Sequence, residues 1–250
     1  MSSDGTLTFV PSVHYSPTHR RRTRETIRRE RPDLVAVELD ERRFERLESR
    51  VRATPADLLH ELPPEMAVTY GTLRAIQQTV VRLYGFDPGK TEMETAIETA
   101  AELGIDVALV DDPIAETFDA LSSRVGLETI PRTMIRAQFM GPKQRLDQFE
   151  LLTLPFREIE SGDDVQPAID QLRWLLPEVA EVLIDRRDRA MATRLRALRR
   201  AGHDVVVVIG AGHHNGIRRV LEELEAADAM PEVDVPIRSP TREVTRIPIE

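Results

Sequence analysis

An apolar run at residues 205–209, Val-Val-Val-Val-Ile, is the strongest structural signal in this chain. The run is short, lies between Asp204 and Gly210, and has no alternating polar positions. Such a segment is typical of a central parallel strand that is buried on both faces. A Gly-Ala-Gly turn and two histidines, His213 and His214, follow at the carboxyl end of this strand. Ligands of open α/β sheets bind at that edge, so the segment predicts both a fold class and a place for a site.

Composition excludes several classes of function. The chain has 250 residues, a formal net charge of −9 and no cysteine. Disulfides, zinc–thiolate sites and cysteine nucleophiles are therefore excluded. The acidic balance argues against a nucleic-acid partner. With Lys90 and Lys143 as its lysines, the chain takes nearly all its positive charge from arginine, which favours a salt-adapted, halophilic protein. Because we find no charged leader and no apolar stretch that could span a bilayer, we expect a soluble, cytoplasmic protein with no membrane span.

Strand and helix patterns alternate along the chain. Strands are expected at residues 6–14, 34–37, 106–110 and 205–209, with helices at 17–30, 41–52 and 92–101. We therefore predict a three-layer α/β fold in which a short, mostly parallel central sheet carries a large helical insertion over residues 114–202. This domain covers residues 1–230. The tail at 231–250 is extended and could be an edge strand, a dimer arm or a partly ordered segment, and an unpaired edge would invite a homodimer.

Four ionisable side chains end the predicted strands: His14, Glu38, Asp111 and His213. Carboxyl ends of parallel strands meet at one edge, so these groups should converge. Two imidazoles with one or two carboxylates match a divalent metal site with an open position for water. The same groups without a metal could run acid–base hydrolysis. The alternative is structural, because strand-end carboxylates commonly cap the following helix.

The remaining histidines have a plainer interpretation. His214 is expected beside the site or at the surface, with the next helix beginning near Asn215. His19, His60 and His203 lie in or beside helices with polar surroundings, where exposed histidines are expected.

Six short motifs follow one another along residues 11–217. They are PSVH at 11–14, PDLVAVELDERR at 32–43, PG-x-x-EM at 88–93, VALVDDPI at 107–114, IDRRDRAMA at 184–192 and GAGHHNGI at 210–217. In this order they resemble the TraB/PrgY/GumN family over roughly residues 5–225. Its relatives include the Tiki metalloproteases and, more remotely, erythromycin-esterase-like and ChaN-like proteins. The resemblance implies an EreA/ChaN-like fold.

The resemblance also implies roles for particular residues. The family has two Gly-x-x-His motifs; Gly210 to His213 keeps one, whereas Pro11 replaces the glycine of the other. A proline there is compatible with an extended strand at a sheet edge. His14, Glu38 and His213 then correspond to groups that line the active cleft and could bind a divalent ion such as Mn, Co or Zn.

Two further residues, Glu92 and Arg187, correspond to catalytic or substrate-binding groups of the family. Arg187 could clamp a substrate carboxylate or orient Glu38, and a helix-to-sheet salt bridge is the structural alternative. The family's Asp-Arg-Asp pattern appears here as Asp111-Asp112-Pro113, which lacks the arginine.

The leading hypothesis is a metal-dependent, peptidase-like hydrolase of the TraB/Tiki type acting on a peptide or amide substrate. One alternative is a metal-independent, esterase-like hydrolase with a histidine base. Another is a regulatory protein that binds a peptide or small ligand without turnover. Many family members carry C-terminal membrane helices and are linked to inhibition of a peptide pheromone, and we expect this chain to be a soluble form without that region.

Overall fold

The structure is a computed structural model that describes residues 4–13, 16–49, 91–124, 129–139, 141, 159–228 and 232–241. The predicted ligand His14 and the helical residue His60 lie outside the described residues. No helix in these described ranges is long and apolar enough to cross a membrane.

The described strands form one five-stranded sheet in the order β1-β4-β2-β3-β5. They are β1 (Leu7–Ser12), β2 (Leu34–Val37), β3 (Asp106–Leu109), β4 (Val205–Gly210) and β5 (Ile237–Arg238). The first four run parallel, and β5 pairs antiparallel with β3. The predicted mostly parallel α/β fold is confirmed, and part of the C-terminal tail forms an edge strand. Because β4 lies between β1 and β2, the end of the apolar run is next to the ends of both strands.

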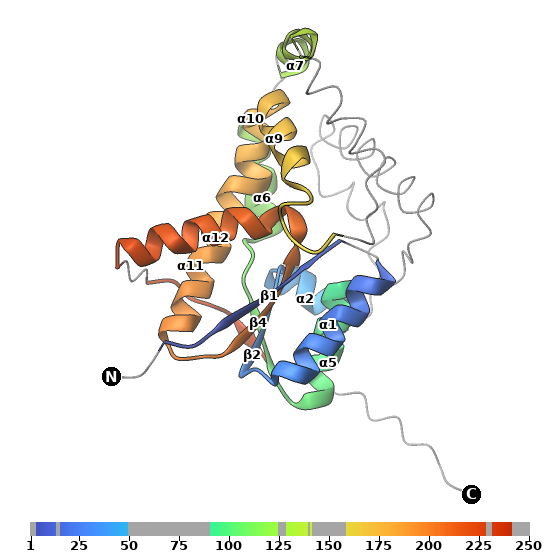
Figure 1. Ribbon diagram of the computed structural model, residues 1–250, viewed down its shortest axis with the longest axis vertical. Coiled ribbons are helices and arrows are strands. Elements are labelled where there is room, and N and C mark those ends of the chain that lie inside the picture. Colours follow the sequence, from blue (N-terminus) through green and yellow to red (C-terminus); the bar gives the residue numbers. More distant parts are fainter. Residues whose placement is uncertain are drawn as a thin grey trace, which may run out of the picture.

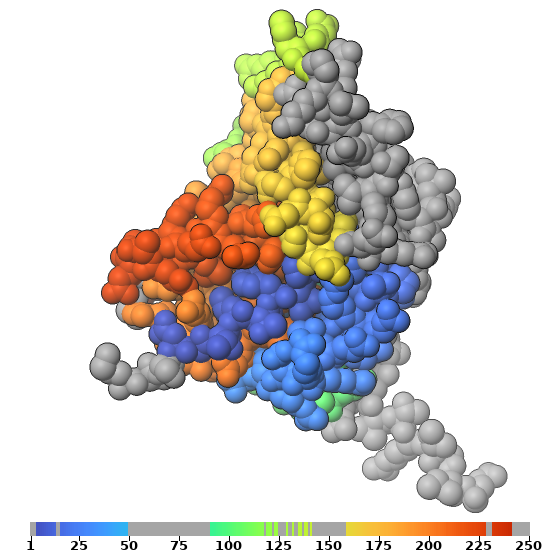
Figure 2. Space-filling model, in the orientation of Figure 1, coloured from blue at the N-terminus to red at the C-terminus, as the bar shows by residue number. Residues whose placement is uncertain are grey.

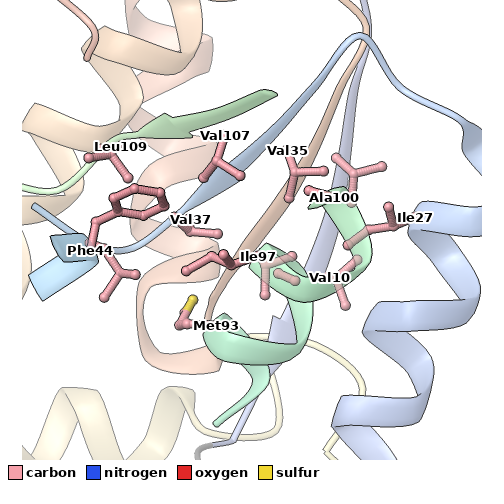
Figure 3. Close-up of a cluster of buried hydrophobic side chains, with 14 residues drawn as sticks. Val10, Ile27, Val35, Val37, Phe44, Met93, Ile97, Ala100, Val107 and Leu109 are labelled. Atoms are coloured by element: carbon pink, nitrogen blue, oxygen red, sulfur yellow. The ribbon is translucent and has the colours of Figure 1, made fainter. Parts of the chain in front are cut away.

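One face of the sheet is covered by α1 (Pro17–Glu30) and α5 (Glu92–Leu103), with α2 (Glu41–Glu48) at its margin. Ile27 of α1, Ile97 of α5 and Phe44 of α2 belong to one buried cluster with the strand valines, in which Phe44 lies beside Val37 and Leu109 (Figure 3). Fully burying an aliphatic side chain of this size contributes about 1.5–3 kcal/mol to folding. This layer therefore fixes α1 and α5, whose amino-terminal turns lie at the carboxyl edge of the strands.

The opposite face is covered by α11 (Arg186–Arg200) and α12 (Ala211–Ala226), which pack on each other and on the sheet (Figure 1). Met191 and Leu195 of α11 and Ile217 of α12 are fully buried against β2 and β4. The sheet thus lies between two helical layers, and the predicted three-layer arrangement is confirmed. α11 belongs to the segment predicted as an insertion, yet it forms part of a layer of the core.

The other helices described within residues 114–185 extend beyond the carboxyl edge of the sheet (Figure 1). They are α6 (Ile114–Arg124), α7 (Thr129–Gln138), α9 (Gln166–Leu175), α10 (Pro177–Ala180) and a π-helical turn, η2 (Glu181–Asp185). The segment before α9, yellow in Figure 2, lies against α12 and the N-terminal part of the chain. Gly162 N–H donates to His214 of α12, Asn215 of α12 donates to Asp163, and Arg22 of α1 donates to the Ile159 carbonyl. This segment is therefore joined to helices on both sides of the sheet.

Pro11 lies inside β1, opposite Ile209 of β4. β1 is at the edge of the sheet, where a residue without an N–H is tolerated. The replacement of glycine by proline thus leaves the strand intact, and Ser12 continues the pairing opposite Gly210.

Candidate functional site

Three of the four predicted strand-end groups come together around one arginine. Glu38 follows β2, Asp111 follows β3, and His213 lies just after β4, while Arg187 comes from α11 on one face of the sheet. The fourth predicted group, His14, lies outside the described residues. Convergence at the carboxyl edge therefore holds for Glu38, Asp111 and His213.

Arg187 binds both carboxylates with its guanidinium group. Its Nε and Nη2 donate to the two oxygens of Asp111 at 3.0 and 2.6 Å, a two-pronged contact. Nη2 also donates to Glu38 Oε1 at 2.5 Å, and Nη1 donates to the Leu183 carbonyl in the π-helical turn at 3.3 Å. The planar, permanently charged guanidinium suits such a geometry, which the single point charge of lysine could not supply. The contact of Arg187 with Glu38 fits two of the predicted interpretations, because it orients Glu38 and is also a salt bridge between helix α11 and the sheet.

Glu38 is held at both oxygens. Oε2 accepts a hydrogen bond from the Gly210 N–H at 2.8 Å, and Oε1 lies 2.5 Å from Arg187 Nη2 and 3.3 Å from His213 Nε2. A Cβ atom at position 210 would lie 3.2 Å from Glu38 Oε2, tighter than most Cβ contacts. Gly210 therefore leaves room for the carboxylate to reach the backbone of β4.

His213 is fixed by a carboxylate, Asp188, to which the sequence motifs assign no role. Its Nδ1 lies 2.6 Å from Asp188 Oδ1, and Asp188 is completely buried. This bond turns Nε2 toward Glu38 and Arg187, since the two ring nitrogens point in different directions. Asp188 follows Arg187 directly in the sequence, so the IDRRDRAMA motif was the available signal.

The helix that carries His213 begins earlier than predicted. α12 starts at Ala211, immediately after Gly210, rather than near Asn215. Gly210 has φ −60° and ψ 138°, so the turn needs no left-handed glycine. The prediction of a glycine loop before the helix was therefore wrong, and His213 is placed by the rigid first turn of a helix.

Asp111 contacts a second arginine, Arg43 of α2, whose Nη2 donates to Oδ2 at 2.6 Å. Arg43 is held by Asp40 through its Nε at 3.0 Å. Asp111 therefore has two arginine partners, although the local Asp-Arg-Asp pattern is absent.

Capping is carried out by Asp40 rather than by Glu38. Asp40 is the N-cap residue of α2 and accepts the Arg43 N–H, and its Oδ2 also accepts the Ile114 N–H at the start of α6. Asp111 Oδ1 accepts the neighbouring Asp112 N–H at 2.8 Å. The capping alternative therefore does not account for Glu38, which faces the cluster.

The electrostatics of the cluster keep its cations charged. Burial lowers the pKa of His213, but Glu38 and Asp188 outweigh this and raise it to about 9. Burial also opposes the charge on Arg187, yet Glu38 and Asp111 raise its pKa. For Asp111, burial is outweighed by the bonds and charges of Arg187 and Arg43, which lower its pKa. Burial raises the pKa of Asp188, and the bond to His213 opposes that rise.

Glu92 lies in a different layer from Arg187 and His213. It is fully buried in the first turn of α5, on the α1 side of the sheet, and its charge acts on His19. His19 is also fully buried, so the prediction of an exposed histidine there was wrong. The polar neighbours in the sequence of α1 point elsewhere, whereas position 19 faces the sheet and α5.

His214 points away from Glu38 and supports the neighbouring helices. It is buried, its Nδ1 accepts the Gly162 N–H at 3.1 Å, and its ring packs edge-on against Phe9 with centroids 5.6 Å apart. The adjacent Asn215 binds Asp163 and Gln166 at the start of α9. The two adjacent histidines thus face different parts of the molecule.

Two atoms of the cluster could share a divalent ion, namely Glu38 Oε1 and His213 Nε2, 3.3 Å apart. Within the part of the chain that is described, no group of three or more His, Asp or Glu side chains is arranged to hold a metal. Arg187 also contacts both donor atoms, at 2.5 and 3.2 Å. The described residues therefore fit a metal in part, and an ion would need His14 as a third ligand and a displaced Arg187.

Parallel strands that end in a buried ionisable cluster, between two helical layers, define an α/β protein with a polar site at the carboxyl edge of its sheet. The chain belongs to the TraB/PrgY/gumN family, which it matches over residues 2–232, as the six motifs predicted. It is also similar to Uncharacterized protein MJ1365 of Methanocaldococcus jannaschii, with 31% identity over 228 residues. That match covers 87% of this chain and 53% of the relative, so the chain spans about half the length of that protein.

Proposed function

We propose that this chain is a hydrolase of peptide or amide bonds in which Glu38 is the general base and His213 the general acid. The observation that carries the proposal is the position of the His213 ring, which lies between Asp188 at Nδ1 and Glu38 at Nε2, 2.6 and 3.3 Å away. A carboxylate and an imidazolium held side by side are the pair that acid–base hydrolysis needs. His14, which comes two residues after β1 in the sequence, is proposed to line the same cleft.

The two groups have complementary tasks in this reaction. Glu38 takes a proton from water while the water oxygen bonds to the substrate carbonyl carbon. His213 then gives its Nε2 proton to the leaving nitrogen as the carbon–nitrogen bond breaks. The proton on Glu38 can return directly to His213, because Glu38 Oε1 lies 3.3 Å from Nε2. A pKa of about 9 keeps His213 in the acid form at neutral pH.

Arg187 supplies the positive charge of the proposed site. Its pKa is raised by Glu38 and Asp111, and it contacts the same Glu38 oxygen that faces His213. A fixed cation there can stabilise negative charge that develops on the substrate carbonyl oxygen. Asp111 would hold Arg187, and Asp188 would hold His213, without touching the substrate.

A metal-dependent form of the same reaction is the second candidate. It is favoured by Glu38 Oε1 and His213 Nε2, which lie 3.3 Å apart and suit neighbouring ligands of one ion. When bound, Mn, Co or Zn would lower the pKa of a coordinated water. His14 would be the third ligand, and His213 would have to lose its Nε2 proton. Glu92 would be a catalytic or substrate-binding group carried by α5. Capping contacts between Thr91 and Glu94 fix the first turn of that helix.

The proposal is tested by incubating the protein with a randomised peptide library and detecting products by mass spectrometry. We expect the wild type to cleave the library, whereas Glu38→Gln and His213→Ala lower the rate by about 10²- to 10⁴-fold. His203→Ala is the matched control, because His203 lies at the other end of β4. It should cleave like the wild type.

Elemental analysis of protein purified without chelator separates the two forms. One equivalent of Mn, Co or Zn that is lost in His213→Ala would support the metal-dependent form. Cleavage that persists in metal-free protein and resists chelator would support the acid–base form. No product under any metal loading would contradict the hydrolase proposal. Peptide binding without turnover would instead fit a regulatory binding protein.

A further inference from the structure

Arg187 contacts two buried carboxylates with one positive charge. Its Nη2 is shared between Asp111 Oδ2 at 2.6 Å and Glu38 Oε1 at 2.5 Å. The side chain of Asp111 is 1% exposed and that of Glu38 is 7% exposed, so water screens neither charge well. One guanidinium alone would leave a buried negative charge unbalanced, which is costly.

Arg43 of α2 supplies a second cation. Its Nη2 donates at 2.6 Å to Asp111 Oδ2, the same oxygen that accepts Arg187. Burial raises the pKa of Asp111, and Arg187 and Arg43 outweigh this and lower it. The charge of Glu38 opposes the two arginines. The described hydrogen bonds of Arg43 lead to Asp111 and Asp40, so Arg43 acts on Glu38 through Asp111 and Arg187.

Asp40 keeps Arg43 in this position. It is buried, and its Oδ2 accepts Arg43 Nε at 3.0 Å and the Ile114 N–H at 2.8 Å. Its Oδ1 accepts the backbone N–H of Arg43 at 2.8 Å. The negative charge of Asp40 thus lies at the N-termini of α2 and α6, where helix dipoles stabilise it. The guanidinium of Arg43 is therefore held where it faces Asp111.

We propose that Arg43 is a positioning residue of the candidate site, which balances the charge of Asp111 and so leaves Arg187 available to Glu38. This inference rests on the proposed function, in which Glu38 is the base and Arg187 the fixed cation. Without Arg43, the two carboxylates would compete for Arg187, and the two-pronged contact favours Asp111. Arg187 would then move away from Glu38, and the site would lose positive charge beside its base.

A double-mutant cycle between positions 43 and 38 tests the proposal in the full chain, with unfolding followed by denaturant titration. Glu38→Gln removes one of the two carboxylates that compete for Arg187. We therefore expect Arg43→Met to raise the unfolding equilibrium constant at least about threefold more in the wild type than in Glu38→Gln. Arg42→Met is the matched control, because Arg42 is the neighbouring arginine of α2 and is exposed. Its effect should be the same in both backgrounds.

An equal effect of Arg43→Met in the two backgrounds would overturn the proposal, because a residue that merely anchors α2 would give that result. Arg43→Lys covers the case in which the methionine variant does not fold. Lysine keeps a charge near Asp111 but lacks the planar fork that joins Asp111 to Asp40. Its effect should also be larger in the wild type than in Glu38→Gln, and an equal effect would overturn the proposal. The cycle needs no catalysis, so a failure of the hydrolase proposal would show as absent cleavage with the cycle unchanged.

Discussion

Arg187 makes it possible to bury Glu38 and Asp111 side by side. Its side chain is 16% exposed, against 7% for Glu38 and 1% for Asp111. Removing carboxylates from water is costly, and a buried ion pair recovers that cost when its hydrogen bonds are complete. Three guanidinium–carboxylate bonds between 2.5 and 3.0 Å meet this condition. Arg187 therefore adds little net stability, but its loss would leave the buried charges of Glu38 and Asp111 without this guanidinium partner.

Replacing Arg187 by methionine should be strongly destabilising, because the volume is roughly kept while two buried carboxylates lose the guanidinium that they share. We expect the free energy of unfolding to fall by about 3–5 kcal/mol, measured by denaturant titration. Arg186→Met is the control, since Arg186 is 41% exposed and pairs with the exposed Glu116 at 3.2 Å and with Asp112 at 3.9 Å. This substitution should cost less than about 1 kcal/mol. Similar losses in both variants would contradict the role given to Arg187.

The position of the His213 ring depends on how closely α11 and α12 approach each other. Asp188 reaches His213 because Gly216, one turn further along α12, has no side chain. A Cβ atom at position 216 would lie 1.7 Å from Asp188 Oδ2, far inside contact distance. The glycine that follows Asn215 therefore permits a helix–helix contact on which the orientation of His213 depends.

Gly216→Ala should separate the two helices and weaken the bond between Asp188 and His213. We expect a loss of about 1–3 kcal/mol in the free energy of unfolding, as for an overpacked core. Gly212→Ala is the matched substitution, because its Cβ would lie 3.3 Å from the flexible end of Ile169. That variant should unfold almost like the wild type, and equal effects of the two alanines would count against this account of α12.

The lengths of the secondary-structure elements were well predicted where the sequence pattern is local. Residues 34–37 and the start of the helix at Pro17 agree with the structure. The predicted start of α12 disagrees with the structure, because Gly-Ala-Gly is typical of a turn although each of these residues can also begin a helix. The burial of His19 was missed for a related reason: the charged residues around it on α1 dominate the local pattern, and the face of the helix that packs on α5 is set by tertiary contacts.

Across the fold, the strand order decides which groups of the site become neighbours. Sequence alternation predicted parallel strands whose ends would meet, and Glu38, Asp111 and His213 do meet. The insertion of β4 between β1 and β2 has no local signal. The packing of α2, α11 and α12 likewise decides two contacts, that of Arg43 with Asp111 and that of Asp188 with His213. Composition and spacing therefore predicted the edge of the sheet but not the partners within the cluster.

The free energy of unfolding should decrease at alkaline pH, because His213 loses its proton there. Its pKa is about 9 in the folded protein against a usual 6.5, so its contribution is complete below pH 6.5 and is lost as the pH rises through 9. That contribution amounts to at most about 3 to 4 kcal/mol. Denaturant titrations from pH 6.5 to 9.5 should show this decline in the wild type and a flatter profile in His213→Ala. Parallel profiles would contradict it.

The proposed site depends above all on a charged His213 held between Asp188 and Glu38. An NMR titration of the histidine rings measures that charge. We predict that His213 titrates near pH 9 in the wild type. In Asp188→Asn its pKa should move down, because one of the two carboxylates that raise it is gone. A wild-type value at or below the ordinary histidine pKa of 6.5 would contradict the proposed acid and the site built around it.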